Sequence, residues 1–295
     1  MLFLHDPSAQ LVLPFISVIA IIFFPPLTKG CPDQCICDSH LAVQCIGKDL
    51  TDFPSSFPLA TRQLIISNNY IRELPALQLN YLSDLVYLDC SNNSLSEITE
   101  STFGNLQKLA YLDLSFNAFT QIDDGMFGPL AGLIILRMTD NPSLSEIYPN
   151  AFVENMVLQV LDVSRNNLTV LNISTLIALP ALRILGLSGN PWLCNCDTED
   201  LCLWMQIEGS RFQDAERTIC QGPPDMTGQR LGDVGMQLRT ECHQSLGQWD
   251  LLFFAAIGFI IFSAGTVSAW VMGALTILYE NYSKKRRQEE EEDEE

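Results

Sequence analysis

Asparagine recurs along one stretch of the chain at an almost constant interval. Six positions are separated by 24 or 25 residues, and they are Asn69, Asn93, Asn117, Asn141, Asn166 and Asn190. Most copies share one sequence motif, in which two apolar residues at alternate positions precede the asparagine and an apolar residue follows it, as in Leu112-x-Leu114-x-x-Asn117-x-Phe119. Six copies in phase argue strongly against chance, and self-similarity at a fixed period of this length predicts a solenoid.

The residue types within each repeat predict how this solenoid is built. The alternating apolar pair faces inward from a short strand, and the asparagine side chain pairs with backbone groups of the next turn, which would each cost about 1–3 kcal/mol if buried without a partner. Two more apolar positions fill the interior: Leu74, Ile98, Ile122, Ile147 and Leu171, then Leu79, Phe103, Phe127, Phe152 and Leu176. The pattern resembles the leucine-rich repeat, which implies an α/β leucine-rich-repeat solenoid with short parallel strands on its concave face.

The acidic composition narrows the possible partners and activities. A formal net charge of −19 argues against nucleic acid or anionic lipid as a partner of the solenoid. The three histidines, His5, His40 and His243, are far apart in the sequence. There is no Gly-x-Ser-x-Gly, His-Glu-x-x-His or phosphate-binding glycine loop. We therefore predict that the protein is not an enzyme and has no cofactor or metal site.

Two long apolar runs flank the repeats. Leu11 to Phe24 is too short to span a bilayer, and we interpret it as the core of a signal peptide cleaved near Gly30, with an uncleaved anchor as the alternative because no Lys or Arg precedes it. Leu251 to Tyr279 carries no charge and is long enough for a tilted transmembrane helix. The basic residues after it predict a cytoplasmic C-terminus.

These features predict seven segments and a single-pass type I protein of the plasma membrane. The segments are 1–30 (signal peptide), 31–60 (N-terminal cysteine cap), 61–190 (six leucine-rich repeats), 191–243 (C-terminal cysteine cap), 244–250 (juxtamembrane linker), 251–279 (transmembrane helix) and 280–295 (a basic, then acidic, cytoplasmic tail). The acidic run from Glu289 to Glu295 is expected to be a disordered, solvated tail.

Eight of the ten cysteines gather at the two ends of the repeats. An oxidising compartment favours disulfides over zinc there, and a disulfide-bonded cap covers the open apolar end of a solenoid. The spacing resembles the caps of extracellular leucine-rich repeat proteins, and this resemblance implies the pairs Cys31–Cys37, Cys35–Cys45, Cys194–Cys220 and Cys196–Cys242. Cys90 occupies an inward leucine position, so it is predicted to be a buried free thiol. Cys202 lies too many strands away from Cys90 for the two to form a disulfide. Cys202 is therefore predicted to be a free thiol as well, and a disulfide to another chain is the alternative.

Three glycosylation sequons and three aromatic residues mark the surface of the solenoid. The sequons begin at Asn92, Asn167 and Asn172, none of which belongs to the asparagine ladder, so their side chains are expected to point into solvent and carry glycans. Tyr87, Tyr111 and Phe116 are expected on adjacent strands of the concave face, where they form a candidate contact patch. The alternative is that these aromatic rings stack across neighbouring strands for stability alone.

Small residues recur along the predicted transmembrane helix. Gly265, Ala269 and Gly273 are four residues apart, so they leave one smooth face on which another helix can approach closely. The alternative is a chance stripe in a span rich in glycine and alanine.

The whole arrangement resembles the leucine-rich repeat auxiliary (gamma) subunits of BK-type, Slo-family potassium channels. The residues that carry this resemblance most specifically are Leu82–Cys90 and Phe262–Gly273, which are most similar to the sperm-associated member of the family. The resemblance implies two partners, a pore-forming Slo-family alpha subunit and the lipid bilayer, and no nucleic acid.

The same resemblance implies a shift of voltage-, pH- or calcium-dependent gating toward opening. The small-residue face would dock on the channel, and a gating-charge cluster would act at the inner membrane surface: Lys284, Lys285, Arg286 and Arg287. The alternative function is a cell-surface adhesion or ligand-binding protein that acts through its concave face.

Overall fold

The computed structural model describes residues 30–243 and 248–292, without the side chains of residues 248–250 and 288–292. The predicted signal peptide, except Gly30, therefore lies outside the described residues. The chain divides into two compact units, Met1–Arg239 and Thr240–Glu295.

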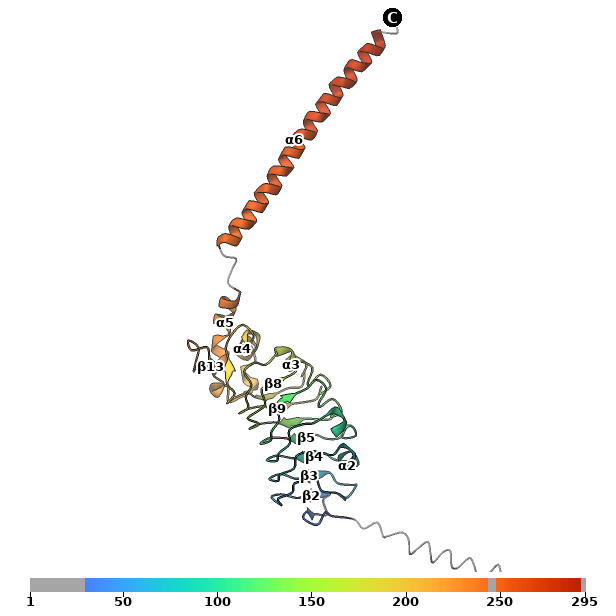
Figure 1. The fold of residues 1–295 in the computed structure, drawn as a ribbon, viewed down its shortest axis with the longest axis vertical. Coiled ribbons are helices and arrows are strands. Elements are labelled where there is room, and N and C mark those ends of the chain that lie inside the picture. Colours follow the sequence, from blue (N-terminus) through green and yellow to red (C-terminus); the bar gives the residue numbers. More distant parts are fainter. Residues whose placement is uncertain (1–29, 244–247, 293–295) are drawn as a thin grey trace, which may run out of the picture. The chain divides into compact units, whose positions relative to one another are not determined.

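A nine-stranded sheet forms the concave side of the first unit, in the order β1-β2-β3-β4-β5-β7-β9-β10-β12. Each of the six repeats contributes one strand, and these are β3 (Gln63–Ile65), β4 (Tyr87–Asp89), β5 (Tyr111–Asp113), β7 (Ile135–Arg137), β9 (Val160–Asp162) and β10 (Ile184–Gly186). The caps add β1 (Ile36–Cys37), β2 (Ala42–Gln44) and β12 (Phe212–Gln213). The strands from β2 to β12 pair in parallel, whereas β1 and β2 are antiparallel. Figure 1 shows β2, β3, β4, β5 and β9 stacked in this order. The expected leucine-rich-repeat solenoid is confirmed.

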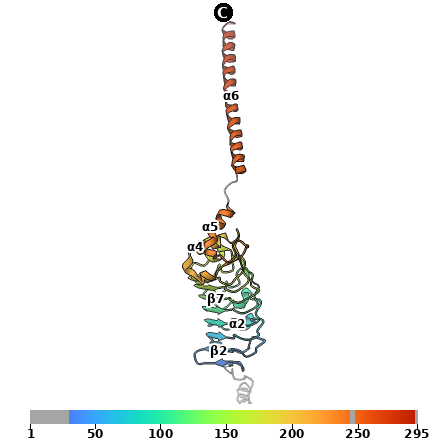
Figure 2. The ribbon, with the colours of Figure 1, turned by 90° about the vertical axis from the view of Figure 1, so that its left-hand side faces the viewer.

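Short elements line the side opposite the sheet, where each repeat turns back. They are α2 (Ala76–Asn80), the 3₁₀ helix η1 (Glu100–Phe103), β6 (Gln121–Ile122), β8 (Glu146–Ile147) and α3 (Ile173–Ile177). Figure 2 shows the strands of the main sheet along one side of the stack and α2 on the other. Between the two sides, the apolar positions of every repeat are buried, and Phe103, Phe127 and Phe152 stack in sequence with ring centroids 6.4 and 5.9 Å apart.

The asparagine ladder connects consecutive repeats through backbone hydrogen bonds. The side-chain amide of Asn117 donates to the carbonyl oxygens of Cys90, Leu114 and Ser115, each at 3.1 Å. Its Oδ1 accepts from the backbone N–H of Leu95 at 3.0 Å. The side chain thus joins its own turn to the preceding repeat, as the sequence predicts.

The C-terminal cap follows the last repeat. Its elements are β11 (Trp192–Leu193), α4 (Glu199–Ile207), η2 (Gly209–Arg211), η3 (Ala215–Arg217), β13 (Cys220–Gly222) and α5 (Leu231–Cys242). Trp192 is fully buried, and its indole N–H donates to the carbonyl oxygen of Leu187 at 3.0 Å. The apolar end of the solenoid is therefore covered by an aromatic side chain whose polar group has a hydrogen-bond partner.

The second unit contains one long helix, α6 (Gln248–Glu292). Its section Leu251–Arg287 has the length and apolarity needed to cross a membrane, and it is the one such section among the described residues. The disulfides of the repeat domain and this helix together indicate a single-pass membrane protein with an extracellular repeat domain.

Candidate functional site

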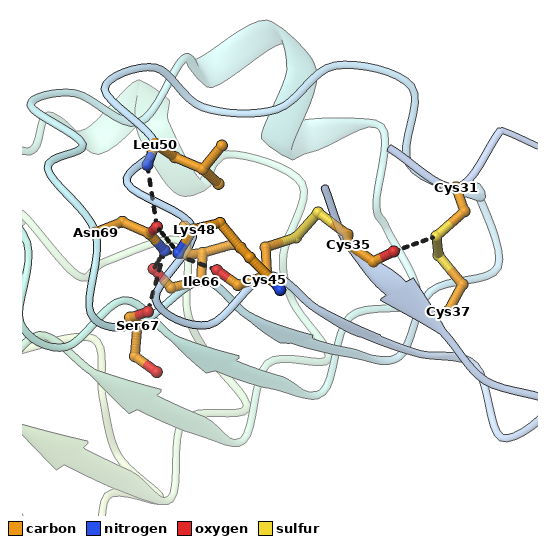
Figure 3. The surroundings of a disulfide bond; sticks show 9 residues. All are labelled: Cys31, Cys35, Cys37, Cys45, Lys48, Leu50, Ile66, Ser67 and Asn69. Carbon is orange, nitrogen blue, oxygen red and sulfur yellow. Dashed lines mark hydrogen bonds between the residues drawn. A yellow bond between two sulfur atoms is a disulfide. The ribbon is translucent and has the colours of Figure 1, made fainter. Parts of the chain in front are cut away.

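The disulfides close the solenoid at its two ends. The N-terminal cap contains Cys31–Cys37 and Cys35–Cys45, with Cα atoms 5.9 and 4.4 Å apart. In Figure 3, Asn69 lies beside this cap, and its Oδ1 accepts from the backbone N–H groups of Lys48 and Leu50. The first ladder asparagine therefore ties the cap to the first repeat.

The C-terminal cap contains the Cys194–Cys220 disulfide, and Cys196 and Cys242 are also disulfide-bonded. The Cys194–Cys220 pair and the two pairs of the N-terminal cap are those that the resemblance to extracellular repeat proteins implies.

Cys90 and Cys202 are free, buried thiols. Burial raises the pKa of Cys90 well above its ordinary value and raises the pKa of Cys202 to about 12. Because the thiolate is the reactive form, neither group is suited to redox chemistry or to bonding another chain.

Tyr87 and Tyr111 lie opposite each other on β4 and β5. Their rings stack with centroids 4.2 Å apart and an angle of 5° between the ring planes, and the Tyr111 hydroxyl donates to Asp113 at 3.1 Å. Burial raises the pKa of both hydroxyls. The pair is half-buried and its rings cover each other, which favours the stabilising role of cross-strand aromatic residues over a contact patch.

The prediction that Phe116 lies on a strand beside the two tyrosines is wrong. Phe116 lies in the turn after β5, with a φ of 55°, and the residue is 53% exposed. The same turn position of each repeat has a positive φ, and these residues are Asn68, Asn92, Phe116, Asp140, Arg165 and Gly189. The tight turn before each ladder asparagine imposes this conformation, which the alternating strand pattern did not reveal.

Side chains interact along this row of left-handed residues. Arg165 makes two hydrogen bonds to the Asp140 carboxylate, at 2.8 and 2.7 Å, and they hold the pKa of Asp140 below its ordinary value. The Asn92 amide donates to Asn68 Oδ1 at 2.7 Å.

The three sequon asparagines, Asn92, Asn167 and Asn172, are exposed on the repeat domain. Asn172 is also the N-cap of α3, because its Oδ1 accepts from the backbone N–H of Ser174 at 2.9 Å and from the Ser174 hydroxyl at 2.7 Å. Glycan attachment at all three stays a prediction.

The hydroxyl groups in the apolar section of α6 form hydrogen bonds within the helix itself. The hydroxyls of Ser263, Thr266, Ser268 and Thr276 each donate to a carbonyl oxygen three or four residues earlier, at 2.7 to 2.9 Å. A Cβ built on Gly265 or Gly273 would meet nothing within 4 Å, so the small-residue face stays uncovered within the described chain. This face is available for a second helix.

The expectation of a disordered acidic tail is wrong for its first residues. Helix α6 continues past the apolar run, through Lys284–Arg287, to Glu292. A continuous helix gives the four basic residues different directions around its axis. The sequence interpretation also missed that Tyr279 and Tyr282 precede them on the same helix, although the spacing of these residues was visible in the sequence.

Comparison with known proteins identifies relatives across most of the chain. The family model for the leucine rich repeat matches residues 61–119, 107–159 and 143–191. Leucine-rich repeat-containing protein 52 of mouse is 39% identical over 251 residues, which cover 85% of this chain and 80% of the mouse protein. The human protein of the same name is 44% identical over 255 residues, which cover 86% and 81% of the two chains. The crystal structure of human trophoblast glycoprotein is 23% identical with a TM-score of 0.46, and covers 68% of this chain and 96% of that one.

Proposed function

The chain belongs to the family of leucine-rich repeat-containing protein 52, and from this premise we propose that it is an auxiliary subunit of a Slo-family potassium channel in the plasma membrane. The family relationship carries the proposal. It agrees with the resemblance of Leu82–Cys90 and Phe262–Gly273 to the auxiliary gamma subunits. The proposed role is a non-catalytic one, in which the chain shifts channel gating toward opening.

The docking surface in this proposal is the small-residue face of α6. Gly265, Ala269 and Gly273 follow one another at intervals of about one helical turn, so they form one stripe along the helix. In lipid, helices associate through close packing rather than through the hydrophobic effect, and small side chains allow the two backbones to approach. Because a Cβ at either glycine meets nothing in the described chain, a transmembrane helix of the channel can pack against this stripe.

The cluster Lys284–Arg287 supplies the electrostatic part of the proposed mechanism. Moving one elementary charge across the membrane field is worth about 2.3 kcal/mol per 100 mV. A coupling of about 1–3 kcal/mol between the auxiliary subunit and the open state therefore shifts activation by tens of millivolts. The acidic residues that follow on the same helix reduce the field of this cluster, so the size of the shift depends on their charge.

The test is a conductance–voltage measurement on Slo-family channels expressed with and without this chain. Surface expression is matched, and two intracellular pH values are used. A leftward shift with one channel supports the proposal and identifies that channel. Unchanged curves with every Slo channel would refute it.

Leucine substitutions separate docking from folding. Gly265→Leu with Gly273→Leu is expected to weaken co-purification with the channel, because two bulky side chains hold the helices apart. Ala256→Leu with Ala274→Leu is the matched control, since both alanines lie about half a helical turn away from Gly265 around the axis and the two leucines add bulk on the other side of the helix. Equal co-purification of all variants would exclude this docking face.

A domain exchange distinguishes the proposal from adhesion or ligand binding through the concave face. Helix α6 and its tail are placed after an unrelated extracellular domain. Retained channel modulation supports the auxiliary-subunit role, whereas loss of modulation together with cell-surface binding by the repeat domain would support the alternative.

A further inference from the structure

A hollow on the surface of α6 lies where the apolar run gives way to the basic cluster. Its volume is about 380 Å³, and it is lined by Tyr279, Tyr282, Ser283, Arg286 and Arg287. These residues are spaced i, i+3, i+4, i+7 and i+8, which places them on one face of a helix. Tyr279 and Tyr282 are 74% and 67% exposed, so this face is uncovered in the second unit.

The hollow has a defined depth in the membrane. Tyr279 is the last residue of the charge-free run that begins at Leu251, and tyrosine is enriched where the hydrocarbon core meets the headgroups. Arg286 lies about 10 Å further along the helix axis at 1.5 Å per residue. The two hydroxyphenyl rings and the guanidinium groups therefore span the boundary between acyl chains and headgroups on the cytoplasmic side.

The lining groups match the chemistry of a phosphate. Arginine presents five N–H donors in a planar fork that fits phosphate oxygens, and the hydroxyls of Tyr282 and Ser283 supply further donors. Tyrosine also offers an apolar ring to the first carbons of an acyl chain. We propose that this face of α6, the Tyr279–Arg287 face, binds the headgroup of an anionic phospholipid of the inner leaflet that carries a phosphomonoester.

The charges on the rest of the tail make the proposal specific. Lys284 and Lys285 lie at i+5 and i+6 from Tyr279, away from the Tyr279–Arg287 face, and Glu280 is spaced i, i+4 from Lys284. The acidic run to Glu295 makes the segment after Tyr279 net negative. Bulk electrostatics would therefore repel an anionic lipid, and binding must come from the local face rather than from net charge. The proposal goes beyond channel regulation, rests on α6 spanning the membrane, and is tested without a channel.

The experiment measures the anisotropy of a fluorescent short-chain phosphatidylinositol bisphosphate titrated with the full chain in neutral detergent. Arg286→Gln with Arg287→Gln is expected to weaken binding about tenfold, because two guanidinium contacts are lost. Lys284→Gln with Lys285→Gln is the matched control, with the same loss of charge on the other side of the helix, and it is expected to change binding by less than about twofold. Tyr282→Leu is expected to fall between the two pairs. Elution of each variant on gel filtration as the wild-type chain does verifies folding.

Three results would overturn the proposal. One is no binding by the wild-type chain. Another is an equal loss for the arginine and lysine pairs, which would indicate non-specific attraction. The third is displacement by free inositol bisphosphate at the concentration of the lipid, which would indicate a soluble phosphate ligand instead of a membrane lipid.

Discussion

Replacing the ladder asparagine Asn117 by alanine tests the physical account of the solenoid most directly. Asn117 is buried, and its side chain makes four hydrogen bonds to backbone groups in its own and the preceding repeat. Alanine removes all four bonds and leaves the amide volume empty.

The substitution does not leave all four backbone groups without a hydrogen bond. The carbonyl oxygen of Cys90 keeps the bond from the Asn93 amide, and that of Ser115 keeps the bond from the backbone N–H of Asn92. The N–H of Leu95 has no such second bond, because Asn117 Oδ1 is its one hydrogen-bond partner among the described residues. A buried unpaired N–H costs about 1–3 kcal/mol. With the weakened carbonyl bonds and the small void, we expect Asn117→Ala to lower the free energy of unfolding by about 2–4 kcal/mol.

Denaturant unfolding of the full chain in detergent, followed by tryptophan fluorescence, measures this loss. Asn150→Ala is the matched control, because the exposed Asn150 side-chain amide makes one hydrogen bond, to Asp124 at 3.2 Å. This substitution should lower the free energy of unfolding by less than about 0.5 kcal/mol. Equal unfolding midpoints for Asn117→Ala and Asn150→Ala would refute the claim that the ladder stabilises the stack.

Three further predictions concern residues whose environment the structure defines. Phe116→Asn should raise the free energy of unfolding by about 0.5–1 kcal/mol, because asparagine tolerates positive φ better than phenylalanine, whereas Phe116→Val should lower it; a lower melting temperature for the asparagine variant would contradict this. Cys90 and Cys202 should resist iodoacetamide at pH 8 until guanidinium unfolds the chain, since their raised pKa values keep both thiols protonated, and mass spectrometry of labelled peptides measures this; labelling of the folded chain would show that they are not buried. Asn172→Asp should lose any glycan but keep the helix cap, whereas Asn172→Ala should lose both and about 1 kcal/mol of stability, as measured by glycosidase mobility shift and thermal melting; equal melting temperatures would remove the capping role.

Periodic features of this protein could be predicted from the sequence because each repeat makes the same local contacts. An inward leucine or a ladder asparagine has the same neighbours in every copy, one repeat before and one after. The parallel register between Tyr87 and Tyr111 follows directly from their separation of 24 residues. The membrane-spanning run is likewise local, since length and apolarity suffice to recognise it.

The role of the aromatic residues on the repeat domain depended on side-chain and backbone geometry that the sequence pattern does not specify. Whether Tyr87 and Tyr111 cover each other or face a partner is decided by their rotamers, and the structure stacks them. Whether Phe116 belongs to a strand or to a turn is decided by backbone hydrogen bonds between repeats, which impose a left-handed conformation there.

The sequence by itself determined the solenoid, its caps and the membrane span, because repetition and hydrophobicity act over a few residues. Only the tertiary structure decided which side chains share a face. In α6 the deciding fact is the extent of the helix: because it continues to Glu292, the sequence spacing places Arg286 on the same face as Tyr279 and Tyr282 and apart from Lys284 and Lys285. Neighbouring charged residues in a sequence can be assigned to one face or to different faces only when the backbone conformation around them is known.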